Sequence, residues 1–462
     1  MKNLLCLFVL SILFLSVSHA DTHEQLVQRA LDTLNRAVTY FYSINTHGGY
    51  VYYITPDLSQ RWGESPADAF TIEVQPPGTP AVGQTFLRAY EVTGNTQALQ
   101  AATDAAFALI RGQNELSGWE HTIRFNRPKR NRVSFDDNQT QSVIRFLMAL
   151  DQHIDHDSLT MAINKALDMM LTSQLDHGGW PHVYPTQNNY HDYATFNDRG
   201  INDCIDVMMD AFRFYKKDAY KKSLAKAGRF LVISQLPPPQ PGWAQQYNEF
   251  LQPAWARSFE PPSVCTLVTV NNINTLIDLY LFTSQNHYLE PIPDALRWLD
   301  AVRLENGKWP RFVELTTNEP LYYDRGRIRV NSVDELHIER RTGYGYETHL
   351  LDRLNDTKKR FNAVKQLGAS GYLKKQAQSL TKDERLAHLA ALQPQVEQTI
   401  QSMDAQGRWV TKNDRYKKHR PGKTWNGEFE IKDRVSSAVF NQNVRLLCDY
   451  IETARSLFDQ GF

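Results

Sequence analysis

Two short polar segments of this chain have residue types that could hold a cation. The segment 134–138 reads Ser-Phe-Asp-Asp-Asn, and the segment 195–198 reads Thr-Phe-Asn-Asp. Each begins 15 residues after a tryptophan, which brings Asp136 and Asp198, 62 residues apart, to corresponding places. Helix capping also favours such residues, although it does not require the repeated aromatic residue. Carboxylates gathered at one rim repel one another unless a cation is present, and all-oxygen ligands suit Ca²⁺ or Mg²⁺. We therefore predict a metal site at Asp136, Asp137 and Asp198.

Arginines recur in loops expected on the same face. Arg257 precedes one apolar segment, and Arg340 and Arg341 precede the next. A single surface arginine is usually solvated, but an arginine fork binds a carboxylate at two points, so this rim could hold an acidic sugar polymer. Trp180 could stack on a sugar, as could Trp119 and Trp309, although repeated Gly-Trp turns are first of all packing elements.

The chain contains two runs of basic residues. The segment 124–132 holds five basic residues just before Asp136. Such a run usually forms a solvated loop, but beside Asp136 it could also attract a polyanion electrostatically. The second run, Lys412 to Lys423, is remote in the repeat order, and we assign it no role from sequence.

A glycine-plus-aromatic turn recurs and divides the chain into repeats. The aromatic residues of these turns are separated by 69, 61, 63, 66 and 100 residues. Two helices and a long loop fill such a period. Apolar spacing predicts first helices over 23–45, 96–113, 158–175, 218–235, 289–303 and 385–403. It predicts more apolar partner helices over 80–93, 137–152, 200–216, 265–284, 342–355 and 435–455.

The helix pattern predicts an all-α fold, an (α/α)6 toroid with short β-strands in the loops. Partner helices that are apolar on most sides belong in the inner layer. The segments 50–54 and 309–315 are rich in β-branched and aromatic residues and predict small strands. Residues 356–384 are charged, lack an apolar period beyond a short helix, and form the insertion behind the gap of 100. We divide the chain into a catalytic domain over 21–355 and a C-terminal part over 356–462 that closes the toroid.

The N-terminus predicts the cellular compartment, and the composition bears on binding partners and on the state of the cysteines. Residues 1–20 have the charged start, apolar stretch and small-residue cleavage site of a secretory signal peptide, and no later segment is apolar enough to span a membrane. We expect a secreted or periplasmic protein. The 51 basic and 51 acidic side chains balance, which gives no argument for nucleic acid binding. Cys204, Cys265 and Cys448 are expected to be buried thiols, with one disulfide still open.

Three motifs together resemble the family 10 pectate lyases. They are His-Gly-Gly-Trp-Pro-His-Val-Tyr-Pro at 177–185, Ala-Thr-Phe-Asn-Asp at 194–198 and Glu-Arg-Arg-Thr-Gly-Tyr at 339–344. The resemblance covers roughly residues 40 to 350, and the last ~110 residues have no clear counterpart. It implies an (α/α) toroid with a groove and cleavage of polygalacturonate by Ca²⁺-assisted β-elimination.

The resemblance also implies roles for individual residues. Asp136 and Asp198 match positions of the cation and substrate centre, and Arg257 matches the arginine that removes the proton. Arg340 and Arg341 match arginines that hold substrate carboxylates. We add Trp180, Arg199 and Tyr344 to the expected substrate contacts, although Arg199 stands where a glycine usually follows Asn-Asp. Because arginine stays protonated in proteins, Tyr184 and Tyr344 are the physical alternatives for the base.

Two other functions remain open from sequence. A glycoside hydrolase could use Asp136 and Asp198 as acid and base, since the same fold hosts such enzymes. The arginines favour a lyase, because a neutral glycan gives them little to bind. A non-catalytic binder of acidic glycans is the second alternative. The hydrolase would act on an acidic or plant cell-wall glycan, whereas the expected partner of the lyase or the binder is an acidic polysaccharide such as polygalacturonate. The expected state is a monomer.

Overall fold

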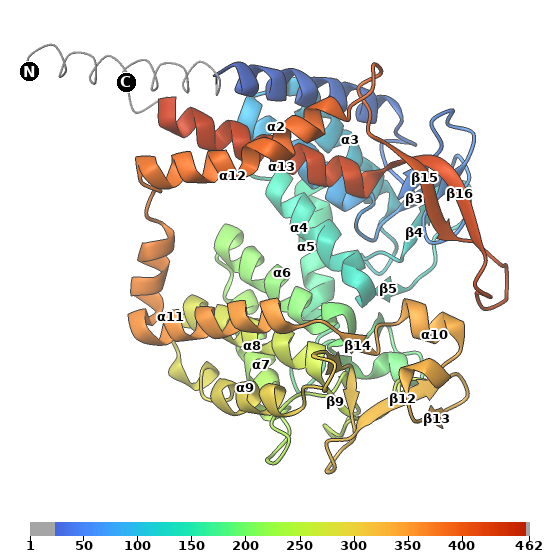
Figure 1. Cartoon of the computed structure of the whole chain (residues 1–462), viewed down its shortest axis with the longest axis vertical. Coiled ribbons are helices and arrows are strands. Elements are labelled where there is room, and N and C mark those ends of the chain that lie inside the picture. Colours follow the sequence, from blue (N-terminus) through green and yellow to red (C-terminus); the bar gives the residue numbers. More distant parts are fainter. Residues whose placement is uncertain (1–23, 459–462) are drawn as a thin grey trace, which may run out of the picture.

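Pairs of antiparallel helices form two concentric layers. The computed structural model describes residues 24–458, which Figure 1 shows from the N-terminal helix in blue to the C-terminal helix in red. The outer helices are residues 24–43, α3 (Thr96–Gly112), α5 (Asp157–Thr172), α7 (Asp218–Ile233), α9 (Ile292–Ala301) and α12 (Lys382–Gln401). The inner helices are α2 (Thr79–Thr93), α4 (Gln139–Leu150), α6 (Gly200–Tyr215), α8 (Thr266–Thr283), α11 (Leu351–Gln376) and α13 (Ser437–Phe458). The predicted α/α toroid is confirmed as the fold.

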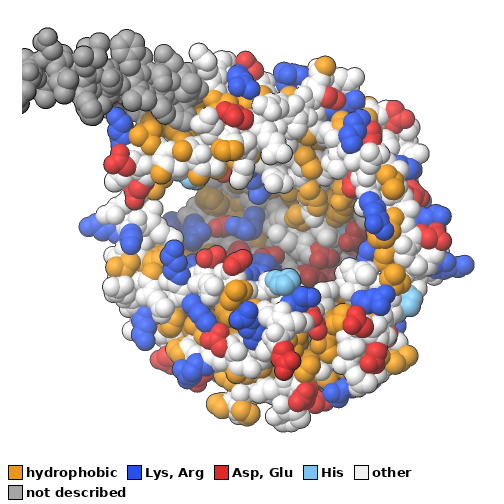
Figure 2. Space-filling view, viewed as in Figure 1, with side chains coloured by type: hydrophobic (Ala, Val, Ile, Leu, Met, Phe, Trp, Pro, Cys, Tyr) orange, Lys and Arg blue, Asp and Glu red, His pale blue; other side chains and the backbone are white. Residues whose placement is uncertain are grey.

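The inner helices pack in the order of the repeats. Helix α13 contacts α2, and the series continues through α4, α6 and α8 to α11. Figure 2 shows a hollow between the part of the molecule formed by α12 and α13 and the part formed by α11. The layer of inner helices is therefore open on this side rather than a closed barrel.

The tryptophan of each repeated turn fastens the end of the preceding outer helix. The Trp180 indole Nε1 donates to the carbonyl oxygen of Met170 at 2.9 Å, and the indole of Trp180 is completely buried. The same bond joins Trp119 to Leu109, Trp243 to Leu231, Trp309 to Leu299 and Trp409 to Thr399. The last carbonyls of a helix have no partner inside the helix, so each indole satisfies a group that burial would otherwise penalise.

Short antiparallel ladders join each repeat to the next along one rim. They are β3 (Thr71–Glu73) with β4 (Thr122–Arg124), β5 (Val133–Ser134) with β6 (Val183–Tyr184), β7 (Ala194–Thr195) with β8 (Gln246–Tyr247), β9 (Val264–Cys265) with β11 (Phe312–Val313), and β10 (Trp309–Pro310) with β14 (Glu347–Thr348). Strands β12 (Pro320–Asp324) and β13 (Ile328–Val330) extend the sheet of β11. The C-terminal hairpin of β15 (Val410–Lys417) and β16 (Phe429–Ser436) pairs with β1 (Tyr53–Ile54), and β1 pairs with β2 (Arg61–Trp62). The last repeat is thereby joined to the first, with Tyr53 opposite Ser436.

The fifth inner helix differs from the prediction. A helix over 342–355 followed by a charged insertion was expected, whereas α10 (Ile338–Gly343) is a short separate helix and α11 continues to Gln376. The left-handed backbone of Gly368, at φ 69°, interrupts α11. Only a narrow stripe of α11 is buried, at Leu354, Thr357, Phe361, Val364 and Ala369. Because α11 faces both solvent and the hollow, few of its residues need to be apolar, and its sequence shows no clear apolar period.

The inner helices are also less apolar than expected on the side of the hollow. Arg145 of α4 donates from Nε to Asp210 of α6 at 2.8 Å, and Arg360 of α11 donates to Asp278 of α8 at 2.5 Å. Figure 2 shows basic and acidic side chains inside the hollow. The prediction of helices that are apolar on most sides holds for α4 and α8, which carry one charged residue each, Arg145 and Asp278, whereas α6 and α11 carry several.

Within residues 24–458, the prediction of buried, free cysteine thiols is confirmed. Cys204, Cys265 and Cys448 are free and buried. No helix of the described chain is sufficiently long and apolar to cross a bilayer. The predicted signal peptide lies outside the described residues.

Candidate active site

The acidic cluster forms where two inner helices begin. Single 3-10 turns at Asp136–Asn138 and Asn197–Arg199 lead directly into α4 and α6 and contact each other. Asp136, Asp137 and Asp198 each offer a carboxylate oxygen, and these atoms lie within 4.8 Å of one another. The structure thus brings together the three residues predicted as metal ligands.

The two turns are built alike, but their correspondence differs by one residue from the prediction. Asp137 and Asp198 have left-handed φ angles of 48° and 44°, and the next residues, Asn138 and Arg199, have φ angles of 56° and 67°. Asp137 is therefore the counterpart of Asp198, whereas Asp136 is the counterpart of Asn197. The tryptophans of these repeats are 61 residues apart, and the equivalent aspartates follow that spacing rather than 62. Consecutive left-handed residues other than glycine are strained and cluster at functional sites.

The carboxylates of the cluster are costly to charge without a cation. Burial, together with the charges of Asp136 and Asp198, raises the pKa of Asp137 to about 7. Burial also raises the pKa values of Asp136 and Asp198. The Oδ1 atom of Asp136 and the Oδ1 atom of Asn138 are buried without a hydrogen-bond partner among the described residues. A site with buried, unpartnered oxygens and mutually repelling carboxylates fits a divalent cation such as Ca²⁺.

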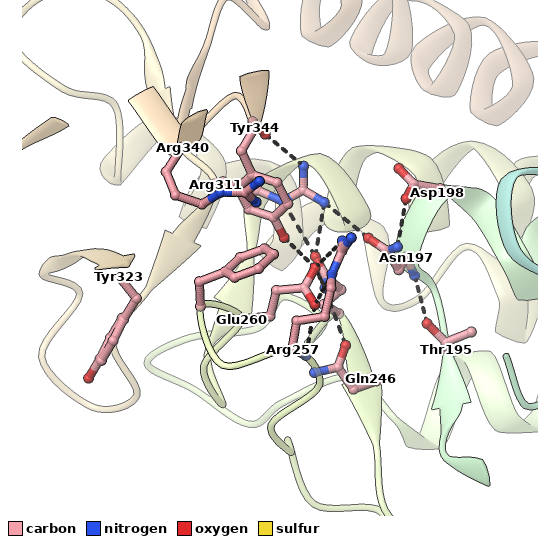
Figure 3. A network of polar contacts seen from close by, with 12 residues as sticks. Thr195, Asn197, Asp198, Gln246, Arg257, Glu260, Arg311, Tyr323, Arg340 and Tyr344 are labelled. Carbon is pink, nitrogen blue, oxygen red and sulfur yellow. Dashed lines mark hydrogen bonds and ion pairs between the residues drawn. The ribbon is translucent and has the colours of Figure 1, made fainter. Parts of the chain in front are cut away.

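Arg257 stands beside the cluster in an ion pair with Glu260 (Figure 3). Its Nε donates to Glu260 Oε2 at 2.8 Å and its Nη2 donates to Oε1 at 2.7 Å. Burial lowers the pKa of Arg257, but the hydrogen bonds and charge of Glu260 outweigh it, and the pKa is raised. Arg257 lowers the pKa of Glu260 to about 2 against the effect of burial. This pair holds the guanidinium firmly in its charged form.

Tyr344 completes this group rather than offering a phenolate. Its hydroxyl donates to Glu260 Oε1, and its ring lies 5.6 Å from the Arg257 guanidinium carbon. Burial raises the pKa of Tyr344 well above its ordinary value. Both features disfavour a phenolate at this residue, and the alternative in which Tyr344 is the base stays an untested prediction. Tyr184 lies in β6, where it pairs with Val133.

Arg311 links the acidic cluster to the Arg257 group, and sequence reasoning missed it. Its Nη2 donates to Asn197 Oδ1 at 3.0 Å and to Gln245 Oε1 at 3.1 Å, and its guanidinium lies 4.3 Å from the centre of the Tyr344 ring. Asn197 in turn donates to Asp198 Oδ2 at 2.6 Å. Figure 3 shows Arg311 between Tyr344 and Asn197. A Trp-Pro-Arg at 309–311, directly after a repeated turn, was the signal that could have revealed it.

Of the other predicted substrate contacts, Arg199 and Arg340 are held in ion pairs, whereas Arg341 is exposed. Arg199 faces the acidic side of the hollow, where Nε donates to Asp203 at 2.8 Å and Nη2 to Asp206 at 3.2 Å. Arg340 is buried, pairs with Glu339 at 2.8 Å and lies over the Phe259 ring. Arg341, one residue further, is exposed on α10. Of the two neighbouring arginines, Arg341 is the one whose side chain is open to a ligand.

The expectation that Trp180 stacks on a sugar is wrong. Its side chain has no exposed surface, and its indole N–H is used by Met170. Trp119 and Trp309 are equally enclosed. Sequence spacing locates these tryptophans but does not tell which way an indole points, and here all of them face the helices.

Comparison with known proteins supports the resemblance found in the sequence. Residues 110–308 match the family model described as pectic acid lyase. A family 10 polysaccharide lyase from Cellvibrio cellulosa, solved as a variant with trigalacturonic acid, shares 19% identity at a TM-score of 0.49, over 63% of this chain and 98% of that chain. A sugar epimerase from a ruminal bacterium shares 10% identity at a TM-score of 0.50, over 92% of this chain and 98% of that chain. The comparison with curated proteins gives no match.

The comparisons bear on the fold of the chain and on the family of one segment. The structural neighbours show the α/α toroid fold. The match over residues 110–308 confirms the recognition of the pectic acid lyase family for this segment, which contains the acidic cluster and Arg257. The family match supports a lyase that acts on polysaccharides.

Proposed function

We propose that the protein is a secreted pectate lyase that cleaves polygalacturonate by Ca²⁺-assisted β-elimination. The observation that carries this proposal is the meeting of three carboxylates within 4.8 Å with the guanidinium groups of Arg257 and Arg311 on one rim. Carboxylate oxygens suit a hard cation, and arginine forks suit the carboxylates of a uronate chain. The match to the pectic acid lyase model supports the same reaction.

The chemistry explains why a cation site and arginines belong together. Removal of the C5 proton of a uronate builds negative charge on the adjacent carboxylate, and the C4–O bond then breaks to leave a 4,5-unsaturated end. A bound Ca²⁺ supplies a positive charge that stabilises this negative charge. Asp136, Asp137 and Asp198 would hold the ion.

The ion pair with Glu260 limits the chemistry that Arg257 can perform. The charged guanidinium, oriented by Glu260, can bind the carboxylate on which charge develops. Its assignment as proton acceptor rests on the family resemblance, because the Glu260 pair favours the protonated form. In either role, loss of Arg257 removes a group that touches the reacting sugar.

The spacing of the carboxylates favours the lyase over a glycoside hydrolase. The acid and base of a hydrolase stand about 5 to 9.5 Å apart, to leave room for the sugar or a water. Here the oxygens of three carboxylates lie within 4.8 Å, and burial raises the pKa values of all three residues. This crowding fits one shared cation better than separate acid and base groups.

One assay tests the proposal. Polygalacturonate, alginate and glucuronan are each incubated with the protein in Ca²⁺ or in chelator, and the ultraviolet absorbance of unsaturated product is followed. We expect product from polygalacturonate only in Ca²⁺. A saturated product end would instead establish a hydrolase, and tight calorimetric binding without chain shortening would establish a binder.

Variants connect the assay to the site. Arg257→Ala is expected to abolish product, whereas Arg303→Ala, at an exposed arginine beside Trp309, is the matched control that keeps activity. Full activity of Arg257→Ala overturns its assignment. Mass spectrometry of the mature protein tests the proposed removal of residues 1–20, and light scattering tests the proposed monomer.

A further inference from the structure

The second basic run of the sequence forms the end of the C-terminal hairpin. Strands β15 and β16 are joined by residues 418–428, and the segment 415–423 contains five lysines and arginines and no aspartate or glutamate. Figure 1 shows this hairpin on the same edge of the molecule as α10. Neither the family match over 110–308 nor the site described above accounts for this charge.

One side of the hairpin lies near the acidic cluster. The ring of Tyr416, late in β15, lies 5.5 Å from the ring of Trp62. Glu64, two residues beyond Trp62, lies 3.7 Å from His121 Nε2, and His121 Nδ1 lies 3.0 Å from Nε2 of Gln139, the first residue of α4 directly after the acidic turn. The hairpin therefore stands beside the proposed catalytic rim.

The end of the hairpin reaches the fifth repeat. A Cβ atom on Gly343 would lie 2.4 Å from Lys417 Nζ, and a Cβ atom on Gly427 would lie 3.1 Å from Ile338 Cδ1. Gly343 and Ile338 are the two ends of α10, which also carries the exposed Arg341. The hairpin thus connects the neighbourhood of the metal ligands with a second arginine-bearing element.

The cations at this end are not neutralised by the protein. Lys418 pairs with Glu428 at 3.0 Å, but no described carboxylate lies within salt-bridge distance of Lys417, Arg420 or Lys423. Lys417 lies over the Trp425 ring at 4.7 Å, which places it without removing its charge. Like charges held together without a counter-charge attract a polyanion.

We propose that Lys417, Arg420 and Lys423, with Arg341 of α10, form a distal subsite for the carboxylates of an acidic polysaccharide chain. The inference rests on the proposed function, because it takes the chain bound at the acidic cluster to continue along the same rim. A short oligomer would occupy only the catalytic part, whereas a polymer would reach both. The hairpin would then set a preference for long substrates.

The experiment compares polymer and trimer as substrates of the full-length mature protein. The triple variant Lys417→Gln, Arg420→Gln, Lys423→Gln is expected to raise the KM for polygalacturonate about tenfold at low salt, which corresponds to three exposed ion pairs. Its kcat, and its KM for trigalacturonate, should stay unchanged. The matched control, Lys221→Gln, Lys222→Gln, Lys226→Gln on the exposed face of α7, removes the same charge and should leave both KM values unchanged.

Binding without turnover separates the inference from the proposed function. In the Arg257→Ala background, the triple variant should migrate through a polygalacturonate-containing native gel with about tenfold weaker retardation, a difference that added salt removes. A triple variant with the polymer KM and retardation of its parent overturns the subsite. An equal rise of KM for trimer and polymer also overturns it, because the lost contact would then lie within the catalytic part. Absence of unsaturated product from every uronate polymer refutes the proposed function instead.

Discussion

Asp137 and Asp198 adopt the same left-handed backbone conformation at equivalent places in successive repeats, with φ angles of 48° and 44°. Burial is the main cause that raises the pKa of each carboxylate, and neighbouring carboxylates raise it further, although Arg311 opposes this rise at Asp198. Backbone strain and charge repulsion therefore coincide at the same residues. A protein keeps both costs where a ligand compensates them.

Replacement of Asp137 by glycine should stabilise the protein while removing its response to metal. Asp137→Gly relieves the left-handed strain and one buried charge, so we expect the free energy of unfolding in chelator to rise by about 1 kcal/mol. Added Ca²⁺ should then no longer raise the urea midpoint. Lys216→Gly, at the left-handed C-cap of α6, is the control: it relieves similar strain and keeps the Ca²⁺ response. A less stable Asp137→Gly protein in chelator contradicts the interpretation.

Stability should fall with rising pH because of Glu73. Burial first, and the charge of Glu64 second, raises the pKa of Glu73 to about 8, above its ordinary value of 4.5. The folded protein therefore holds this proton more tightly than the unfolded chain does. The associated stability is complete below the unfolded pKa and is lost as pH rises through about 8.

Substitution separates this contribution from other titrations. The urea midpoint of Glu73→Gln should exceed that of the wild type by more near about pH 9 than near about pH 5. Glu64→Gln should flatten the wild-type slope in part, since it removes the neighbouring charge. Equal midpoint differences at both pH values would show that Glu73 titrates normally.

The buried indoles should contribute to stability and not to catalysis. Trp180→Phe removes the hydrogen bond to the Met170 carbonyl, which keeps only the bond from the Ser173 hydroxyl at 3.2 Å, so we expect a cost of about 1 kcal/mol. We expect the kcat and KM of the folded variant to be unchanged. Trp243→Phe breaks the same bond one repeat later and should behave alike. A selective rise of KM in Trp180→Phe would restore a sugar contact.

Arg311 should act by positioning Asn197 and, through it, Asp198. Arg311→Lys keeps the positive charge but loses the fork that reaches Asn197 and Gln245 together. Partners that orient ligands typically change metal affinity by about 10- to 100-fold, so the Ca²⁺ dissociation constant, measured by calorimetry, should rise within that range. Arg303→Lys, an exposed arginine, should leave it unchanged. Unaltered Ca²⁺ affinity in Arg311→Lys would remove this role.

Spacing and residue type predicted much of the architecture and part of the site. The repeated Gly-Trp turns located the helix pairs because each tryptophan closes an outer helix, and the segments after Trp119 and Trp180 led to the three aspartates. Arg311 escaped because its partners Asn197 and Gln245 lie far away along the chain, and no local pattern encodes such contacts. Glu260 follows Arg257 by only three residues, but its burial and its bond to the distant Tyr344 have no local signal. The hairpin at 410–436 escaped because its strands alternate charged residues and lack a buried face over most of their length.

The indole bonds at the ends of five outer helices fix those helices independently of the rim segments that follow. The rim segments are themselves packed, because Phe135 and Phe196 are completely buried and the ladders between repeats lie there. Only exposed stretches such as residues 126–131 can therefore change length without altering the helices around them. We expect loop grafts from related toroids to fold when the ladder strands and the buried aromatic residues are kept, which leaves the exposed stretch of a repeat as a site for redesigning substrate preference.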